Sequence, residues 1–557
     1  MTVGAARPQP AVRIPARNAE DVVIAAFDAP MTVDPHAAFD SGSRHVVLNV
    51  YESLLRFDEH DRGFQPWVAT EVGCSDDGLR YRFRVRSGIV DQLGYRLAAI
   101  DAQYSVRRSI ITAPGPGSLW LSALLGPERA DTAVVGDLVE ACSRVQLDGD
   151  AVVIKLSRPF EPFLAVVAQW ALVLSQRWAV SCGAWPGDLD NIEDYAGAEH
   201  QLLDVTNGTG PYALEHLERE PQARAVFRRH RQYWRDARCP PRVTVTAIQD
   251  RRVRECALLD GRVDYAVCQP ESLPRIAASQ DVVCEQTRDE WHINPLGIVT
   301  YKLAADASAG NRFPRCGLSD LHLRRALSLA FDYERFVADA LQGDPIEHPG
   351  PFPAPALPDG PRPAYSFDPE RARCELRRAW GGAAVTDGFD LAVYTHRDNY
   401  AREVAAEILA DGFNELDARC RVSVIAVGFD ELVRDTFAGR CPLAWLSWDA
   451  DYLHPYAFGR ELLSSSALLP RSTGMRLDAA DPLLLAALET NDERQRGEIY
   501  GRLAQAAIDG CCYLFVPGKV SYLNYHARWT GVRLFPGASN ALDFASFRPR
   551  AEVPSPA

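Results

Sequence analysis

The most constraining feature of the sequence is that its hydrophobic residues follow two different periods. In RYRFRVR, Tyr81, Phe83 and Val85 alternate with arginines, and a period of two predicts a β-strand with one solvated face. Further strands are expected for VVIAAF, AVVIKLS and RVTVTAI, which begin at Val22, Ala151 and Arg242. Later segments repeat apolar residues every three or four positions, as helices do. Because neither pattern builds a sustained strand–helix–strand repeat, we expect a mixed α/β fold.

Capping residues mark where the expected helices begin. Residues 319–341, SDLHLRRALSLAFDYERFVADAL, are predicted to form one helix opened by Ser319 or Asp320. Asp368 and Pro369 stand at the N-cap and the first position of the next expected helix. Two more amphipathic helices are predicted at 399–413 and 498–510. The proline-rich residues 348–363 are expected to form a loop.

Length and charge limit the class of protein. The chain has 557 residues, too many for one ordinary core, so two or three domains are expected. The net charge of -14 argues against nucleic acid as a partner, because phosphate binding needs clustered lysine and arginine. The longest apolar runs are too short for a transmembrane segment. Without an apolar export signal the chain as written is expected to be cytoplasmic, or extracytoplasmic if a signal has been removed.

Several common kinds of site are not indicated. The 13 cysteines include no C-x-x-C pair, and we interpret most of them as small buried residues in a reducing compartment. The sequence has no Walker phosphate loop, no H-E-x-x-H zinc motif and no G-x-S-x-G nucleophile motif. The histidines lack the spacing of metal ligands. We therefore expect no cofactor and no metal.

The stretch SWDADYLHPYAF, residues 447–458, contains two acidic groups among aromatic ones. Asp449 and Asp451 lie between Trp448 and Tyr452. If this segment is buried, its carboxylates are poorly hydrated and strongly prefer a cationic partner. The stretch is therefore a candidate binding site for a positively charged group.

Eight segments, in order between about residues 50 and 460, form a larger pattern. They are VYESLLRFD, PWVATEVGCSDDGLRYRFRVRSG, NGTGPYAL, RHRQYWRD, RVTVTAIQDRRVRECALLDGRVDYAV, LSDLHLRRALSLAFDYERFV, FDPERARCELRRA and LSWDADYLHPYAF. The collinear series resembles family 5 solute-binding proteins, the dipeptide-, oligopeptide- and nickel-binding receptors of ABC importers. The chain is identified as a member of that family by the series rather than by any one segment.

The resemblance implies an α/β, periplasmic-binding-protein-like fold of type II, cluster C. Two lobes joined by hinge strands would close around a central ligand cleft, with an extra domain added to the first lobe. The expected bounds are 20–58, 186–275 and 520–550 for lobe I, 59–185 for the extra domain and 276–519 for lobe II. Residues 1–19 and 551–557 are expected tails.

The resemblance also implies ligand contacts. Asp451 stands where peptide-binding relatives place the aspartate that pairs with the ligand's α-ammonium, with Asp449 as a second candidate. Arg402 stands where dipeptide receptors place an arginine for the ligand carboxylate. The remaining expected ligand contacts are Trp448, Tyr452, Tyr51, Trp291 and His292. The structural alternatives are a turn cap for Asp451, an exposed helix arginine for Arg402 and core packing for the aromatic residues.

Two functions follow from this reasoning. The first is a monomeric binding protein that encloses a peptide or an amine-bearing small molecule and, if exported, delivers it to an ABC permease. The alternative is an intracellular enzyme or carrier that reuses the fold, for condensation or cyclisation of an amino-acid-derived substrate in specialised metabolism. The acid–base groups of such an enzyme would come from Asp451, Asp449, Glu290, His292, His454 and Glu52.

Overall fold

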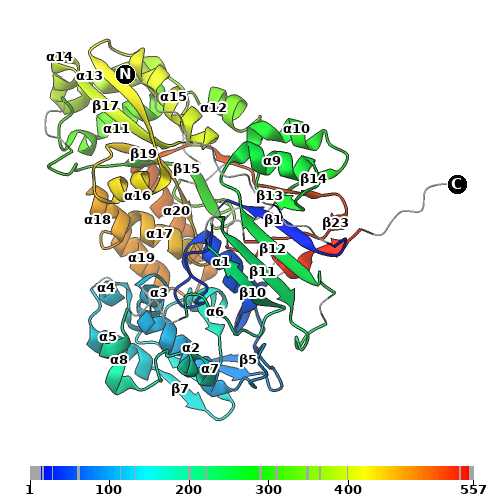
Figure 1. Cartoon of the computed structure of the whole chain (residues 1–557). Helices are drawn as coiled ribbons and strands as arrows, with labels where there is room; N and C mark the ends of the chain where they lie inside the picture. The colour runs from blue at the N-terminus through cyan, green and yellow to red at the C-terminus, as the bar shows by residue number, and fades with distance from the viewer. Residues whose placement is uncertain are drawn as a thin grey trace.

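The structure is a computed structural model in which three units can be distinguished (Figure 1). It describes residues 14, 18–27, 29–58, 63–112, 114–130, 132–197, 202–219, 222–236, 238–287, 291–307, 312–346, 350–362, 365–397, 399–538 and 541–550. Glu290, residues 551–557 and most of residues 1–19 lie outside these ranges. The three units are described in turn, each around its own sheet.

Lobe I is built on a seven-stranded sheet from distant parts of the chain. Its strand order is β10 (Tyr212–Glu218), β11 (Arg224–Arg229), β12 (Arg242–Ala247), β1 (Val22–Ala26), β13 (Tyr265–Ala266), β22 (Tyr522–His526) and β14 (Val282–Gln286). Its helices are α1 (Ser41–Val50), α9 (Arg251–Leu259) and α10 (Leu273–Ala277), and a short ribbon joins β23 (Trp529–Thr530) to β24 (Arg548–Pro549). Strand β14 pairs with β22 in this sheet, whereas the expected bounds assign its residues to lobe II.

The extra domain surrounds a four-stranded antiparallel sheet. The order is β5 (Ala69–Cys74), β6 (Arg80–Val85), β8 (Ala151–Lys155) and β7 (Val145–Asp148). The helices are α2 (Ala99–Thr112), α3 (Pro114–Leu125), α4 (Pro127–Ala130), α5 (Val135–Ser143), α6 (Phe163–Trp170), α7 (Gln176–Ser181) and α8 (Ile192–Tyr195). Phe83 and Val85 are buried while Arg84 is exposed, so the strand predicted from the period of two is confirmed. Two short ribbons, β2 (Glu52–Ser53) with β9 (Leu172–Val173) and β3 (Leu55–Asp58) with β4 (Gly63–Pro66), lead into this domain.

Lobe II contains a five-stranded mixed sheet. The order is β18 (Cys420–Val427), β17 (Phe389–His396), β19 (Leu443–Asp449), β15 (His292–Val299) and β20 (Tyr513–Phe515). Its helices are α11 (Leu321–Ala330), α12 (Tyr333–Ala340), α13 (Pro369–Arg378), α14 (Ala383–Asp387), α15 (Tyr400–Asn414), α16 (Phe429–Phe437), α17 (Pro455–Leu463), α18 (Leu468–Thr473), α19 (Ala480–Glu489) and α20 (Glu493–Asp509). In Figure 1 this lobe lies above the extra domain, and lobe I lies beside both.

The predicted single helix at 319–341 is wrong, because two helices occupy this segment. The Asp320 carboxylate accepts a hydrogen bond from the Leu323 amide at 3.0 Å and caps α11. The Asp332 carboxylate then accepts from the Arg335 amide at 2.9 Å and caps α12. The predicted Asp368 cap of α13 is confirmed.

Two chain crossings connect the lobes. The first runs from β14 in lobe I to β15 in lobe II. The second leaves lobe II at β20, passes through β21 (Gly518–Lys519) and enters β22 of lobe I. Strand β21 pairs with β16 (Pro345–Ile346), which belongs to lobe II. We call residues 516–521 the second hinge segment, because they are the described part of the chain that crosses there.

The cysteines of this chain form no disulfide bond. All 13 cysteines are free thiols. The interpretation of most of them as buried is only partly right, since Cys74, Cys182, Cys256, Cys316 and Cys374 are exposed. Within the described ranges, no group of three or more His, Cys, Asp or Glu side chains is arranged to hold a metal ion. No helix of the described chain is long and apolar enough to cross a membrane.

Candidate functional site

All three units meet at a cavity of about 110 Å³, which we call the three-way cavity. The end of β19 and the residues after it reach the cavity with Asp449, Ala450 and Asp451, so the acidic stretch singled out in the sequence lies at a junction between the lobes. The other lining residues are Phe39, Ser41, Arg44, Gly537 and Ala538 from lobe I and Gln169 and Trp170 from the extra domain. A group bound here would contact every unit of the molecule.

Asp451 is held in the three-way cavity by its backbone. Its carbonyl oxygen accepts a hydrogen bond from Trp170 Nε1 at 2.7 Å. The pKa of the Asp451 carboxyl is raised to about 7, chiefly by burial and then by the nearby Glu461, although Arg460 and Arg44 act to lower it. The carboxyl is thus poised between its neutral and charged forms at neutral pH, and an added cation would favour the charged form.

Arg44 is a site residue that the sequence reasoning missed. It lies on α1, is 7% exposed, and its guanidinium lies 4.2 Å from the centre of the Trp170 ring. Neither Nη1 nor Nη2 has a hydrogen-bond partner in the part of the chain that the structure describes. Burial lowers the pKa of Arg44 to about 10, while Asp451 and Asp40 oppose the shift. Its place one turn before the buried Val47 was the available signal, because it puts an arginine on an apolar helix face.

A second polar cluster lies around Asp449. Arg402 on α15 is only 4% exposed, so it is not the exposed helix arginine of the structural alternative. Its Nη2 donates to Ser447 Oγ at 2.7 Å, and its Nε has no partner among the described residues. His292 stands opposite Asp449 across β15 and β19. Burial lowers the pKa of His292, and Asp449 opposes this shift.

Tyr51 and Glu52 occupy a different place, where lobe I joins the extra domain. The Tyr51 hydroxyl accepts a hydrogen bond from the Asn207 amide at 3.2 Å. The Glu52 carboxylate accepts from four neutral donors: Trp67 Nε1 at 2.8 Å, Tyr233 OH at 2.8 Å, Trp234 Nε1 at 2.7 Å and Thr209 Oγ1 at 3.0 Å. Burial raises the pKa of Glu52, while these donors oppose the shift. Neither residue lines the three-way cavity.

A larger cavity of about 1270 Å³, the large interlobe cavity, takes lining residues from all three units. Trp291 and His454 contribute to it. His454 Nε2 forms an ion pair with the Glu161 carboxylate of the extra domain, and Arg496 on α20 lies 3.3 Å from the other carboxylate oxygen. This trio therefore links lobe II to the extra domain inside the cavity.

The expected site residues are only partly brought together. Asp449 and Asp451 share the three-way cavity, with Arg402 and His292 next to Asp449. Trp448 is half-buried in β19 opposite Ile293, and Tyr452 is buried. Among the acid–base candidates of the enzyme alternative, Glu52 and His454 lie in separate environments, and Glu290 lies outside the described residues. Of the candidates that the structure describes, Glu52 and His454 therefore lie apart from Asp449 and Asp451.

The sequence of this chain is similar to those of known bacterial solute-binding proteins. The profile of the bacterial extracellular solute-binding proteins, family 5 Middle, matches residues 63–468. A probable D,D-dipeptide-binding periplasmic protein of Escherichia coli strain K12 is 23% identical over 506 residues, which cover 89% of this chain and 88% of the relative. A glutathione-binding protein of Salmonella paratyphi A is 22% identical over 500 residues, covering 87% and 86%.

Solved structures show the same fold. A dipeptide-binding protein from Pseudoalteromonas, solved in complex with Met-Leu, superposes with a TM-score of 0.74 at 19% identity and covers 95% of this chain and 100% of that chain. A periplasmic binding protein from Helicobacter pylori, solved in complex with the peptide STSA, gives a TM-score of 0.72 at 18% identity and covers 95% and 98%. The two-lobed α/β fold is therefore confirmed.

Proposed function

The chain belongs to the family 5 bacterial extracellular solute-binding proteins, and from this premise we propose that its ligand is a short peptide or another small molecule with a free amine. Solute binding is the role of the family. Relatives named for D,D-dipeptides, glutathione and di- or tripeptides support a peptide-like ligand. The finer question is which groups of this chain recognise it.

The observation that carries the proposal is the position of Asp451 in the three-way cavity. Its carboxyl has a pKa near 7 because it is buried, so a ligand ammonium would complete its charge balance. The two Nη groups of Arg44, buried and without partners in the described chain, supply donors for a carbonyl oxygen of the same ligand. An ammonium next to a carbonyl group is the pattern found at the N-terminus of a peptide.

Lobe closure would complete this site, because its lining comes from lobe I, lobe II and the extra domain. Ligand binding would then release water and hold Asp451 and Arg44, which already line the same cavity, around one group. We further propose delivery to the permease of an ABC importer, as expected for a receptor of this family. Such a receptor acts outside the cytoplasm, where the permease takes up its substrate.

The test compares a dipeptide with its N-acetylated form. Wild-type protein is titrated with alanyl-leucine and with N-acetyl-alanyl-leucine by calorimetry, and the Asp451→Asn variant is titrated in the same way. We expect the variant to lose about 2–4 kcal/mol of binding free energy for the free dipeptide, the range for breaking a buried charge pair. The acetylated peptide should bind wild type and variant with similar, weak affinity.

The control is Asp478→Asn, which removes an exposed carboxylate of lobe II far from the cavity linings described above. It should bind the dipeptide as wild type does. Undiminished binding by Asp451→Asn would contradict the role of Asp451, and tighter binding of the acetylated dipeptide would contradict recognition of a free amine.

A further inference from the structure

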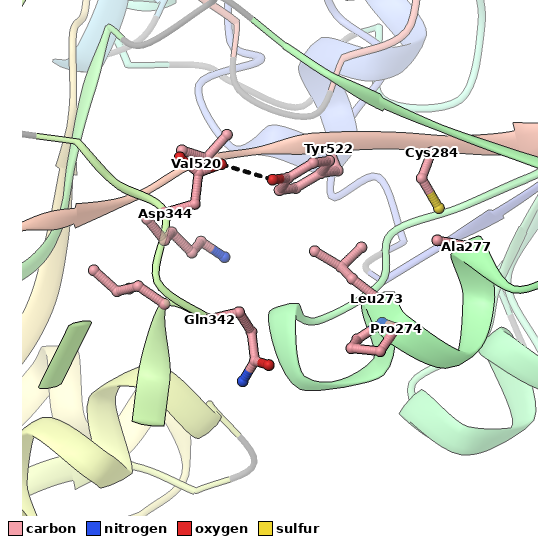
Figure 2. Close-up of a pocket in the computed structure, with 10 residues that line it drawn as sticks. Leu273, Pro274, Ala277, Cys284, Gln342, Asp344, Val520 and Tyr522 are labelled. Carbon is pink, nitrogen blue, oxygen red and sulfur yellow. Dashed lines mark hydrogen bonds between the residues drawn. The ribbon is translucent and has the colours of Figure 1, made fainter. Parts of the chain in front are cut away.

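A third cavity, of about 310 Å³, lies along the second hinge segment, and we call it the hinge cavity. Lobe I contributes Leu273, Pro274, Ala277, Cys284 and Tyr522, while lobe II and the hinge contribute Leu341, Gln342, Asp344, Lys519 and Val520. Figure 2 shows the α10 residues on one side and Gln342 and Asp344 on the other. Its volume is at the lower end of the range for small-molecule sites.

Lys519 is the cationic side chain of the hinge cavity. No hydrogen bond or ion pair joins its ammonium group to another side chain of the described residues. Lysine is rare in this chain, where most basic residues are arginines. The lysines are Lys155, Lys302 and Lys519. Burial lowers the pKa of Lys519 to about 8, and Arg402 lowers it as well, against Asp449. Asp449 acts on this ammonium through its charge without a hydrogen bond to it, so an anion placed in the cavity would stabilise the partly buried group further.

The acid nearest in the lining does not serve as a counter-ion of Lys519. The Asp344 Oδ2 accepts a hydrogen bond from the Tyr522 hydroxyl at 2.8 Å, drawn as the dashed line in Figure 2. No ion pair between Asp344 and Lys519 is formed within 4 Å in this part of the structure. Leucine, proline, alanine and valine side chains make up most of the remaining wall. The cavity therefore combines one cation with an apolar surface.

We propose that the hinge cavity, whose lining residues differ from those of the three-way cavity, is a second binding site for a small carboxylate with an apolar body. The carboxylate pairs with the Lys519 ammonium, and the body packs against Leu273, Pro274 and Leu341. Both lobes line the cavity, so a bound carboxylate contacts both and favours the closed arrangement of the molecule. The cargo site and the hinge site are then coupled through lobe closure.

The first test asks whether binding in the hinge cavity depends on the negative charge of the ligand. Wild-type protein is titrated calorimetrically with 4-methylpentanoate and with its neutral amide, 4-methylpentanamide, which has nearly the same shape. We expect the acid to bind at least tenfold more tightly than the amide, because only the acid can pair with the ammonium. Equal affinity for acid and amide would overturn the proposal.

Lysine variants provide the second test. Lys519→Met keeps an apolar stem without the charge, so it should bind acid and amide equally. Lys519→Arg keeps the charge and should retain the preference for the acid. Lys302→Met is the matched control, since Lys302 is exposed in lobe II, and it should behave as wild type. A preference for the acid that survives in Lys519→Met would place the carboxylate elsewhere and refute the proposal.

Closure gives an independent readout. Small-angle scattering should show a smaller radius of gyration when 4-methylpentanoate is added to wild type, and no change with Lys519→Met. The outcome is distinguishable from a failure of the cargo proposal, because Asp451→Asn leaves the hinge cavity intact and should still respond to the carboxylate. An unchanged radius of gyration at saturating carboxylate would contradict the coupling to closure.

Discussion

Two acids with raised pKa values, Glu52 and Asp451, are accommodated in different ways. The Glu52 carboxylate has four neutral hydrogen-bond donors and ties lobe I to the start of the extra domain. Asp451 instead lies among charged side chains, with Arg44 and Arg460 opposed by Glu461 and Asp449. A carboxylate that already accepts several hydrogen bonds is stabilised little by a ligand. A carboxylate whose pKa lies near neutral pH becomes charged when a cation binds beside it. This contrast supports a structural role for Glu52 and the recognition role that we propose for Asp451.

Asp451 should make the stability of the ligand-free protein depend on pH. Its pKa is about 7 in the fold, above its ordinary value of 3.8, so the stability linked to its protonation is complete below pH 4 and is lost as pH rises through 7. Asp451→Asn lacks this dependence. We expect the melting temperature of wild type, relative to the variant, to fall by about 2–4 °C between pH 5 and pH 8.

Differential scanning calorimetry at these two pH values measures the effect. Asp478→Asn, at an exposed position, serves as the reference for general changes in net charge. If the difference between wild type and Asp451→Asn stayed constant from pH 5 to pH 8, the carboxyl would not titrate in this range.

At the scale of elements, the break between α11 and α12 depends on one capping residue. Replacing Asp332 with alanine removes the acceptor for the Arg335 amide, and the loss of such a cap typically costs about 1 kcal/mol. We expect faster hydrogen exchange in peptides covering the first turn of α12, which mass spectrometry can measure. Asp339→Ala on the same helix is the control, because it removes only an exposed ion pair with Arg335. Equal exchange in both variants would show that the cap is dispensable.

The elements themselves could be predicted better than their interruptions. Alternation at Tyr81, Phe83 and Val85 and the cap at Asp368 need only local spacing, and both were predicted. The cap at Asp320 was predicted as one of two choices, the other being Ser319. The break at Asp332 was missed because the apolar stripe continues through Phe331 into the next helix. A capping aspartate inside a helical pattern is also compatible with an exposed polar position, so the sequence alone left the break hidden.

The site was harder to predict because its members come from separate segments. The stretch around Asp451 was recognised as a candidate from its own composition. Arg44 and Lys519, in contrast, matter through neighbours that lie hundreds of residues away, and nothing in their local sequence shows those neighbours. Spacing along the chain can predict a helix face, but it cannot predict which face of another unit will lie against it.

At the scale of the whole molecule, an ion cluster joins the extra domain to lobe II. Glu161 pairs with His454 and Arg496. Burial acts to raise the pKa of Glu161, but these two partners lower it below its ordinary value. Lobe II moves relative to the extra domain when a two-lobed receptor opens, so this cluster belongs to the closed arrangement. Glu161→Gln should therefore shift the ligand-free protein toward the open arrangement.

Small-angle scattering tests this shift. We expect a larger radius of gyration for Glu161→Gln than for wild type at pH 7. Glu71→Gln is the control, because Glu71 forms an exposed ion pair with Arg84 on neighbouring strands of the extra domain. A radius of gyration unchanged by Glu161→Gln would mean that closure does not need the cluster.

The pairing of β15 with β20 has a consequence for how such a receptor can diversify. These strands open and close the excursion of the chain through lobe II, and Leu296 lies opposite Phe515. The two ends of the lobe are thus neighbours, as they are in an inserted cassette. One half of the binding surface can be exchanged as a unit while the other half keeps its sheet, so new specificities can arise by recombination as well as by point mutation.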